Sequence, residues 1–215
     1  MIKLKDILLE NTAPSIFTAR RTDDRQKRQA ANIYRKYEAV VKEYIAGGSK
    51  GSLVFSHGTD FSLTGFPHIL KNVIVDGNFT CNFCNLKSLK NSPKQVNGMF
   101  ACSYNKLQSL EGITQNVRDI IFCDFNKLSN LKGLPTHKSY GIYCNNQEVQ
   151  EFSLVGAPEI VDGTFNCSGN YIFSLEGCPK KVTLGFYMKD NESNVRFTEE
   201  QIKAVCDVGV KIQVD

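Results

Sequence analysis

The chain has 215 residues and a net charge of +4, with 41% hydrophobic and 22% charged residues, a composition that suits one domain with a small additional cap. Its apolar runs fall short of the ~18 residues of a membrane span, and no signal-peptide apolar region follows the start. The charge is uneven, because residues 1–50 hold eleven Lys and Arg against six Asp and Glu, or +5, whereas residues 51–215 carry −1.

The first ten residues form a short amphipathic segment, which the Pro-containing stretch 11–15 ends. Four apolar residues can share one helix face: Ile2, Leu4, Ile7 and Leu8. One interpretation is a short helix that docks on the rest of the chain. The segment also resembles the N-terminal capsid-targeting peptides of internal proteins in large tailed phages, which are processed after a Leu-or-Ile, any-residue, Glu triplet. Leu8-Leu9-Glu10 fits that triplet. The resemblance therefore implies a processing site at Leu8 and Glu10 and packaging in the virion.

A long helix is predicted from Thr22 to about Ala46, after an extended linker that completes the segment 1–21. Thr22 is a suitable N-cap, and two Asp residues follow it in the first turn, where the helix dipole favours acids. Gly47-Gly48 end the helix. Its apolar stripe comprises Ile33, Tyr37, Val40, Val41 and Tyr44. We expect the segment 22–48 to cover the N-terminal end of the structure that follows.

Residues 75–179 contain one unit written five times. Five cysteines are spaced by 21, 21, 21 and 23 residues: Cys81, Cys102, Cys123, Cys144 and Cys167. Apolar residues stand in phase before and after each of them, and each unit turns at Gly-x-Pro or a related triplet. The shared text is V-x-G-x-F-x-C-x-x-N-x-L-x-S-L-x-G-x-P. A fixed period of this length predicts stacked structural units, a solenoid.

The middle of each unit carries the pattern L-x-L-x-x-N-x-L, as in Phe100-Ala-Cys102-Ser-Tyr-Asn105-Lys-Leu107. Over about two thirds of its length the chain therefore resembles the leucine-rich-repeat family, most closely the short bacterial and phage variety. Two units depart from the pattern, since Cys84 and Gln147 stand where the Asn belongs. The resemblance implies an α/β-type arc of about seven turns dominated by short parallel β-strands. Together with the opening segment, it implies an origin in a large tailed bacteriophage.

Alternation within the unit predicts which side chains are buried. Phe100 and Cys102 alternate with outward residues such as Ala101 and Ser103, as in a short β-strand. The Asn of the unit is predicted to be buried and to bond backbone groups of the next turn, which forms a ladder. These residues are Asn105, Asn126 and Asn170. The cysteine column is expected to fill the narrow interior as free thiols, which implies a reducing bacterial cytoplasm.

The units extend in both directions beyond the five clear ones. Backward, Phe55 takes the Cys position of a first unit, Leu63 follows it, and residues 68–72 form an insertion. Forward, Met188 takes the Cys position and Asn191 joins the ladder. Seven turns result, and the outer two are imperfect, as terminal units are in such arrays.

Residues 49–194 hold these seven turns, and residues 195–215 form a C-terminal cap. Thr198 begins a capped amphipathic helix that runs to Cys206. A last strand follows, whose apolar residues share one face: Val208, Val210, Ile212 and Val214. Both ends of the sheet are thus expected to be covered, which favours a monomer over a fibre.

No enzyme is predicted, because no catalytic constellation occurs. The three histidines pair with no Ser or Cys in a recognisable motif: His57, His68 and His137. The chain has no phosphate-binding Gly-rich loop, dinucleotide fingerprint or zinc-protease motif. Cys81 and Cys84 form the one C-x-x-C pair, without the second pair or the His that a zinc site requires. We therefore expect neither a cofactor nor a metal.

The outward strand residues line one continuous face and are candidate protein-binding residues. The polar ones are Thr80, Asn82, Ser103, Asp124 and Asn145. The aromatic ones are Phe122, Tyr143 and Tyr187, with Phe83, Tyr104 and Phe125 following at the rim. Aromatic residues on a polar concave sheet are typical anchors of a protein interface. The alternative is that these rings only stack on each other between adjacent turns.

Two functions fit these features. The first is a non-enzymatic protein-binding module whose concave face captures a host or virion protein that the sequence does not identify. The second is a packaged internal protein or a nucleic-acid-associated protein that acts through the basic residues of segment 1–50, which also suit a solvated helix face. No membrane partner is expected. Binding that survives moderate salt favours the first function, and steep loss of binding with salt favours the second.

Overall fold

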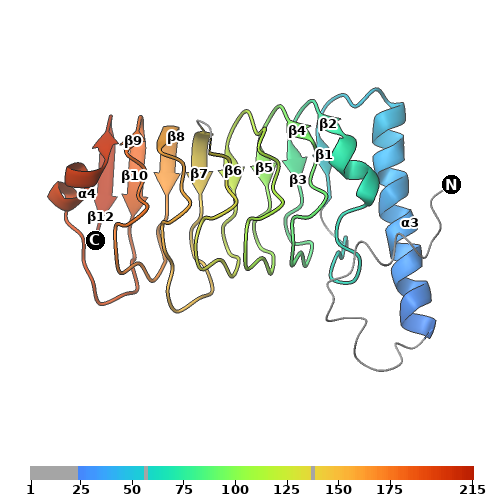
Figure 1. Cartoon of the computed structure of the whole chain (residues 1–215), viewed down its shortest axis with the longest axis horizontal. Coiled ribbons are helices and arrows are strands. Elements are labelled where there is room, and N and C mark those ends of the chain that lie inside the picture. Colours follow the sequence, from blue (N-terminus) through green and yellow to red (C-terminus); the bar gives the residue numbers. More distant parts are fainter. Residues whose placement is uncertain (1–23, 56–57, 137–138) are drawn as a thin grey trace.

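The computed structural model describes residues 24–55, 58–136 and 139–215. Within them the chain is an α/β protein with a ten-stranded sheet and few helices, and every described strand pair is parallel. The strands lie side by side along the long axis, with helix α3 at one end and helix α4 at the other (Figure 1). The opening segment 1–21, with the candidate processing residues Leu8 and Glu10, lies outside the described parts, as do Thr22, His57 and His137.

Eight strands form the main path of the sheet, in the order β1, β3, β5, β6, β7, β8, β10, β12. Their bounds are Leu53–Val54, Phe79–Thr80, Phe100–Ala101, Ile121–Phe122, Ser139–Tyr143, Ile160–Asn166, Gly185–Met188 and Lys211–Val214. Equivalent positions of successive units pair directly, Phe79 with Phe100 and Phe165 with Phe186. Strand β1 pairs with β3 in the same register. The predicted parallel strands and their register are confirmed, and β12 lies in the segment where a last strand was predicted after the seven turns.

A second row of shorter strands runs where each unit returns. Strand β2 (Ile74–Val75) pairs with β4 (Gln95–Val96), and an isolated bridge joins Val96 to Val117. Farther along, β9 (Lys181–Val182) pairs with both β8 and β11 (Asp207–Val208). The valines that lead the unit face inward here: Val75, Val96, Val161 and Val182 are fully buried. The interior is the space between this row and the main path.

Columns of equivalent side chains fill this interior. The five cysteines of the repeated unit are fully buried and free. The thiols of Cys123 and Cys144 donate to carbonyl oxygens of the next strand, those of Tyr143 and Asn166, at 3.3 and 3.4 Å. Burial raises the pKa of Cys123 and Cys144 well above the ordinary value, so both thiols stay protonated. The predicted interior column of free thiols is therefore present.

The predicted Asn ladder is also present. Asn126 is fully buried, and its Oδ1 accepts the backbone N–H of Leu107 at 3.1 Å. Its Nδ2 donates to the carbonyl oxygens of Cys102 at 3.0 Å and Cys123 at 3.1 Å. One side chain thus joins two neighbouring turns and satisfies backbone groups that water cannot reach. Asn191 continues the ladder through bonds with the backbone of the preceding unit.

The two departures from the Asn pattern behave differently. Gln147 reproduces the ladder with its longer side chain, since its Oε1 accepts the N–H of Leu128 at 3.1 Å and its Nε2 donates to the Cys123 carbonyl at 3.0 Å. Cys84 has no amide, and its thiol donates instead to the carbonyl oxygen of Phe55 at 3.0 Å. Cys84 belongs to the first of the five clear units, which is preceded only by the imperfect first turn that contains Phe55.

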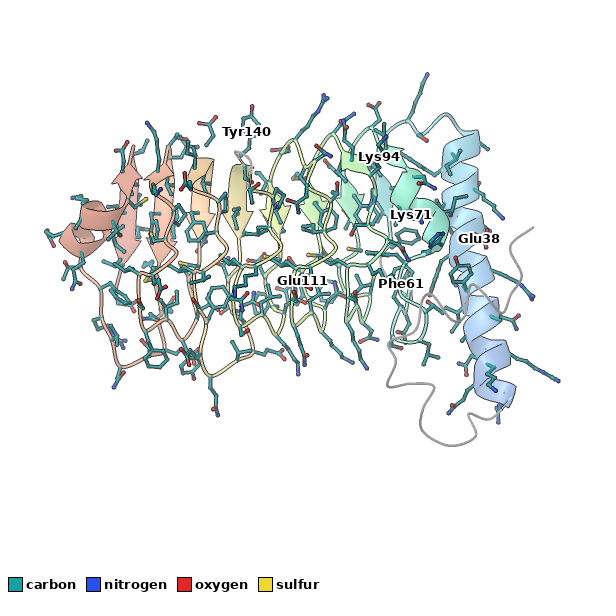
Figure 2. The ribbon with its side chains drawn as sticks, in the orientation of Figure 1. Glu38, Phe61, Lys71, Lys94, Glu111 and Tyr140 are labelled. Carbon is teal, nitrogen blue, oxygen red and sulfur yellow. The ribbon has the colours of Figure 1, made fainter. Side chains whose placement is uncertain are left out.

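Helix α3 (Asp24–Ala46) ends where the sequence predicts and packs on the N-terminal end of the sheet. The Tyr37 ring meets the rings of Phe61 at 4.7 Å and Phe55 at 6.2 Å, edge to face. Figure 2 shows Phe61 in this position beside the helix. The predicted insertion forms the 3-10 helix η1 (His68–Asn72), which also contacts α3.

Two predictions at this end are wrong. Val40 is 36% exposed and Leu63 is 43% exposed, although both were expected on inward faces. The buried positions belong to Tyr34 and Phe66. The physical reason is geometric: the helix meets the sheet end through Tyr34, Tyr37 and the fully buried Val41, so Val40 turns towards solvent.

The C-terminal cap begins as predicted and ends differently. Thr198 forms a capping box with Gln201 at the start of α4 (Glu199–Val205). The predicted single strand is wrong, because it is split into β11 and β12, and Val210 between them is 75% exposed. The chain steps there from the second row to the main path, and the N–H of Val210 donates to the carbonyl oxygen of the also exposed Leu184 at 3.0 Å.

Candidate functional site

A stacked pair of rings stands in the middle of the open face, which we define as the outward side chains of the main sheet path. Phe122 of β6 and Tyr143 of β7 are partners in register, and their rings stack at 4.8 Å and 24°. This is the separation that adjacent strands impose. Both side chains are half-buried. The two rings stack on each other, as the alternative interpretation predicts, and they also remain accessible on the open face. Their role as anchors of a protein interface stays a prediction.

Asp124 is the polar centre of the same face. Its Oδ1 accepts the backbone N–H of Asn145 at 2.9 Å, and its Oδ2 accepts the hydroxyl of Ser103 at 3.1 Å. Burial raises the pKa of the Asp124 carboxyl, and the hydrogen bonds from Asn145 and Ser103 oppose that shift without cancelling it. A carboxylate whose ionised form is disfavoured where it stands is typical of sites kept for function, here on the outward side of the sheet.

We expect Asp124→Asn to raise the free energy of unfolding above that of the unchanged protein, and to do so more at pH 7 than at pH 4. The pKa of the Asp124 carboxyl is raised in the folded state. The stability that its protonated form contributes to the unchanged protein is therefore fully present below the unfolded pKa of about 3.9, and it is lost as the pH rises through the folded pKa. The amide carries no charge and keeps an acceptor for Asn145. Urea unfolding of both proteins at the two pH values measures the difference. A gain that is the same at pH 4 and pH 7 would contradict the assignment.

A second aromatic stack lies where the strands end. Phe83 and Tyr104 stack at 4.3 Å and 12°, and Tyr104 and Phe125 at 4.4 Å and 9°. We call these three residues the rim stack. Phe83 is 56% and Tyr104 is 44% exposed. All three have positive φ, between 50° and 57°. Large side chains disfavour this left-handed conformation by on the order of 1–3 kcal/mol each.

The backbone conformation at the positions equivalent to the rim stack does not require aromatic residues. The next three equivalent positions are Asn146, Gly169 and Asp190, also with positive φ, and these residue types accept that conformation. The aromatic residues of the rim stack are therefore present despite the local backbone preference. Their stacking recovers part of the strain, and their exposed edges form an apolar strip beside the open face.

The remaining predicted site residues are placed unevenly. Thr80, Asn82 and Tyr187 are half-buried on the open face, as expected. The prediction that Ser103 is an outward, accessible residue is wrong, because it is only 5% exposed and its hydroxyl donates to the Asp124 carboxylate. Ser103 lies two residues beyond the end of β5, and its N–H and hydroxyl donate to the longer side chains of Asn82 and Asp124.

A cleft of about 530 Å³ adjoins the end of the rim stack, and the sequence did not reveal it. Phe125 lines one part of it, and Glu148, Gly169, Tyr171 and Glu192 line others. These residues come from four successive units, and none belongs to a motif with known chemistry. The one available signal was the change from rings to Asn and Gly along the column of the rim stack.

Comparison of the chain with protein families, with curated proteins and with solved structures found no match. No helix in residues 24–55, 58–136 and 139–215 is long and apolar enough to cross a membrane. In the same parts of the chain, no group of three or more His, Cys, Asp or Glu side chains is arranged to hold a metal ion. The class of the site is thus defined by its geometry: an extended face of rings and polar groups.

Proposed function

We propose that this chain is a leucine-rich-repeat-type solenoid that binds another protein through its open face and rim stack. The in-register parallel strands, the buried Asn ladder and the 21-residue spacing support the solenoid assignment. As in the sequence hypothesis, the partner is a host or virion protein, and the role is non-enzymatic.

One observation carries the proposal: three accessible rings are held in a backbone conformation that disfavours them, next to a stacked ring pair and a half-buried carboxylate. A ring that served only folding would be fully covered, as Phe79 and Phe100 are. Rigid aromatic surface with polar groups around it is the composition found at the centres of protein interfaces. The strain and the exposure are both explained if a partner covers these rings.

The test is truncation of the ring pair. We expect Phe122→Ala, Tyr143→Ala to abolish capture of the partner from host or infected-cell lysate, because ring truncation at a binding centre typically costs 2 kcal/mol or more, about thirtyfold in affinity. Melting temperature should change little, since both rings are half-exposed. Phe173→Ala is the matched control, because Phe173 is 45% exposed and lies outside the open face. Captured proteins are identified by mass spectrometry.

Two outcomes would contradict the proposal. If the double variant unfolds, the rings belong to the core. If it folds and still captures the same protein, binding occurs elsewhere, and the exposed basic residues of α3 become the surface to test. The second candidate function, nucleic-acid binding through these basic residues, predicts binding that falls steeply with salt, because each neutralised phosphate of a nucleic acid releases counterions.

A further inference from the structure

The cleft beside the rim stack has an aromatic wall and an open floor. Phe125 stacks against Tyr104 on one side and lines the cleft on the other. At the next two positions of this column the rings are replaced by Asn146 and Gly169, and the Asn146 amide occupies the place that a Cβ of Gly169 would take. The cleft is lined by these two residues, by Phe125 and, two units on from Phe125, by Tyr171.

The charge of the rim reverses at this cleft. The residue that follows each ladder position forms an outer column, which reads Asn85, Lys106, Lys127, Glu148, Tyr171 and Glu192. Its basic half runs beside the rim stack, and its acidic half lines the cleft. Lys127 and Glu148 meet at the boundary, with Nζ and Oε2 3.6 Å apart. No lysine or arginine is among the residues that line the cleft.

We propose that this cleft accepts a lysine or arginine side chain of the protein partner, whose chain continues over the rim stack. The inference rests on the proposed function and adds the chemistry of one contact. A cation at the Phe125 end of the cleft would have the Phe125 ring, whose face attracts positive charge, and the Glu148 carboxylate one unit on, which it would share with Lys127. Glu192, two units beyond Glu148, adds negative charge at the far end of the cleft. Tyr171 lines the far side of the cleft together with Glu192, and the Glu192 carboxylate raises the pKa of the Tyr171 hydroxyl.

The neighbouring lysines specify where the cation binds. Lys87, Lys106 and Lys127 gather around a separate hollow of about 290 Å³ on the basic half of the rim. A partner cation is repelled there and attracted at the cleft, so the charge pattern selects one register of the partner along the rim. The size of the cleft, about 530 Å³, exceeds one side chain and leaves room for the flanking backbone.

The experiment uses two defined probes on the full chain. One is the blocked pentapeptide Gly-Gly-Arg-Gly-Gly, and the other replaces its arginine by citrulline, which has the same shape without the charge. Backbone amide shifts are followed by NMR during titration to about 10 mM, well into the range of millimolar dissociation constants. We expect the arginine peptide to shift the amides of Gly169 and Glu148 saturably and to bind roughly three- to tenfold more tightly than the citrulline peptide.

Variants localise the effect. Glu148→Gln combined with Glu192→Gln should abolish the difference between the two peptides, since both carboxylates are exposed and neither supports the core. Glu111→Gln is the matched control, because Glu111 is an exposed turn residue, labelled in Figure 2, and does not line the cleft. It should leave the difference unchanged. Equal binding of the two peptides, no shift up to the highest concentration, or shifts centred away from the cleft would each overturn the inference.

The same variants separate this inference from the proposed function. If the Glu148→Gln, Glu192→Gln protein captures the partner as well as the unchanged protein does, while the Phe122→Ala, Tyr143→Ala protein does not, the open face binds protein and the cleft contact is wrong. If ring truncation leaves capture unaffected, the proposed function itself is wrong, whatever the peptides show.

Discussion

Replacing Asn126 by Ala is expected to lower the free energy of unfolding by about 3 kcal/mol. The side chain is fully buried and joins the Leu107 N–H to the carbonyl oxygens of Cys102 and Cys123. Alanine leaves these groups without a partner in a dry interior, and each unsatisfied buried group costs on the order of 1–3 kcal/mol. The loss acts on two neighbouring turns at once, because the amide lies between them.

Urea unfolding of three variants tests this prediction. Asn116→Ala is the control, since Asn116 is exposed and its removal should alter stability by less than about 0.5 kcal/mol. Asn126→Gln should be milder than Asn126→Ala, because Gln147 makes the equivalent bonds in the next unit. Equal stability of the Asn126→Ala protein and the unchanged protein would mean that the amide is not needed to satisfy the interior.

Replacing Gly133 by Ala is expected to destabilise the protein by about 3 kcal/mol or more. Gly133 has φ of +102°, and a Cβ there would lie 2.5 Å from the carbonyl carbon of Leu110 and 2.6 Å from the nitrogen of Glu111. These are backbone atoms of the preceding turn, so no side chain can move aside. The turns must separate locally, which disturbs the packing on both sides.

Gly65→Ala helps to separate the conformational penalty of a positive φ from the collision of the added Cβ with the preceding turn. Gly65 occupies the same turn position in the first unit, with φ of +59°, but nothing lies within 4 Å of its added Cβ. It therefore carries the conformational penalty alone, on the order of 1 kcal/mol. The difference between the two variants in urea unfolding measures the close approach of successive turns together with the larger φ of Gly133. Equal destabilisation would show that the turns can move apart freely.

The period of the sequence determined most of the fold. Because equivalent residues recur every 21 positions, in-register parallel pairing buries every column at once, and any other register would mix buried and exposed positions. The cysteine column and the buried Asn126 and Asn170 follow from the same alignment. So does the positive φ of the turn residues, where Gly133 stands beside Leu110 of the turn before it.

The ends and the rim were decided by tertiary structure. Periodicity describes contacts between like units, and it carries no information about how a helix meets the first turn, which is why Val40 and Leu63 were misassigned. The split at Val210 arises from a step between two rows of strands that short apolar alternation cannot distinguish from one strand. The strained rings, the half-buried Asp124 and the cleft at Gly169 depend on side chains from neighbouring turns, so only the stacked structure brings their groups together.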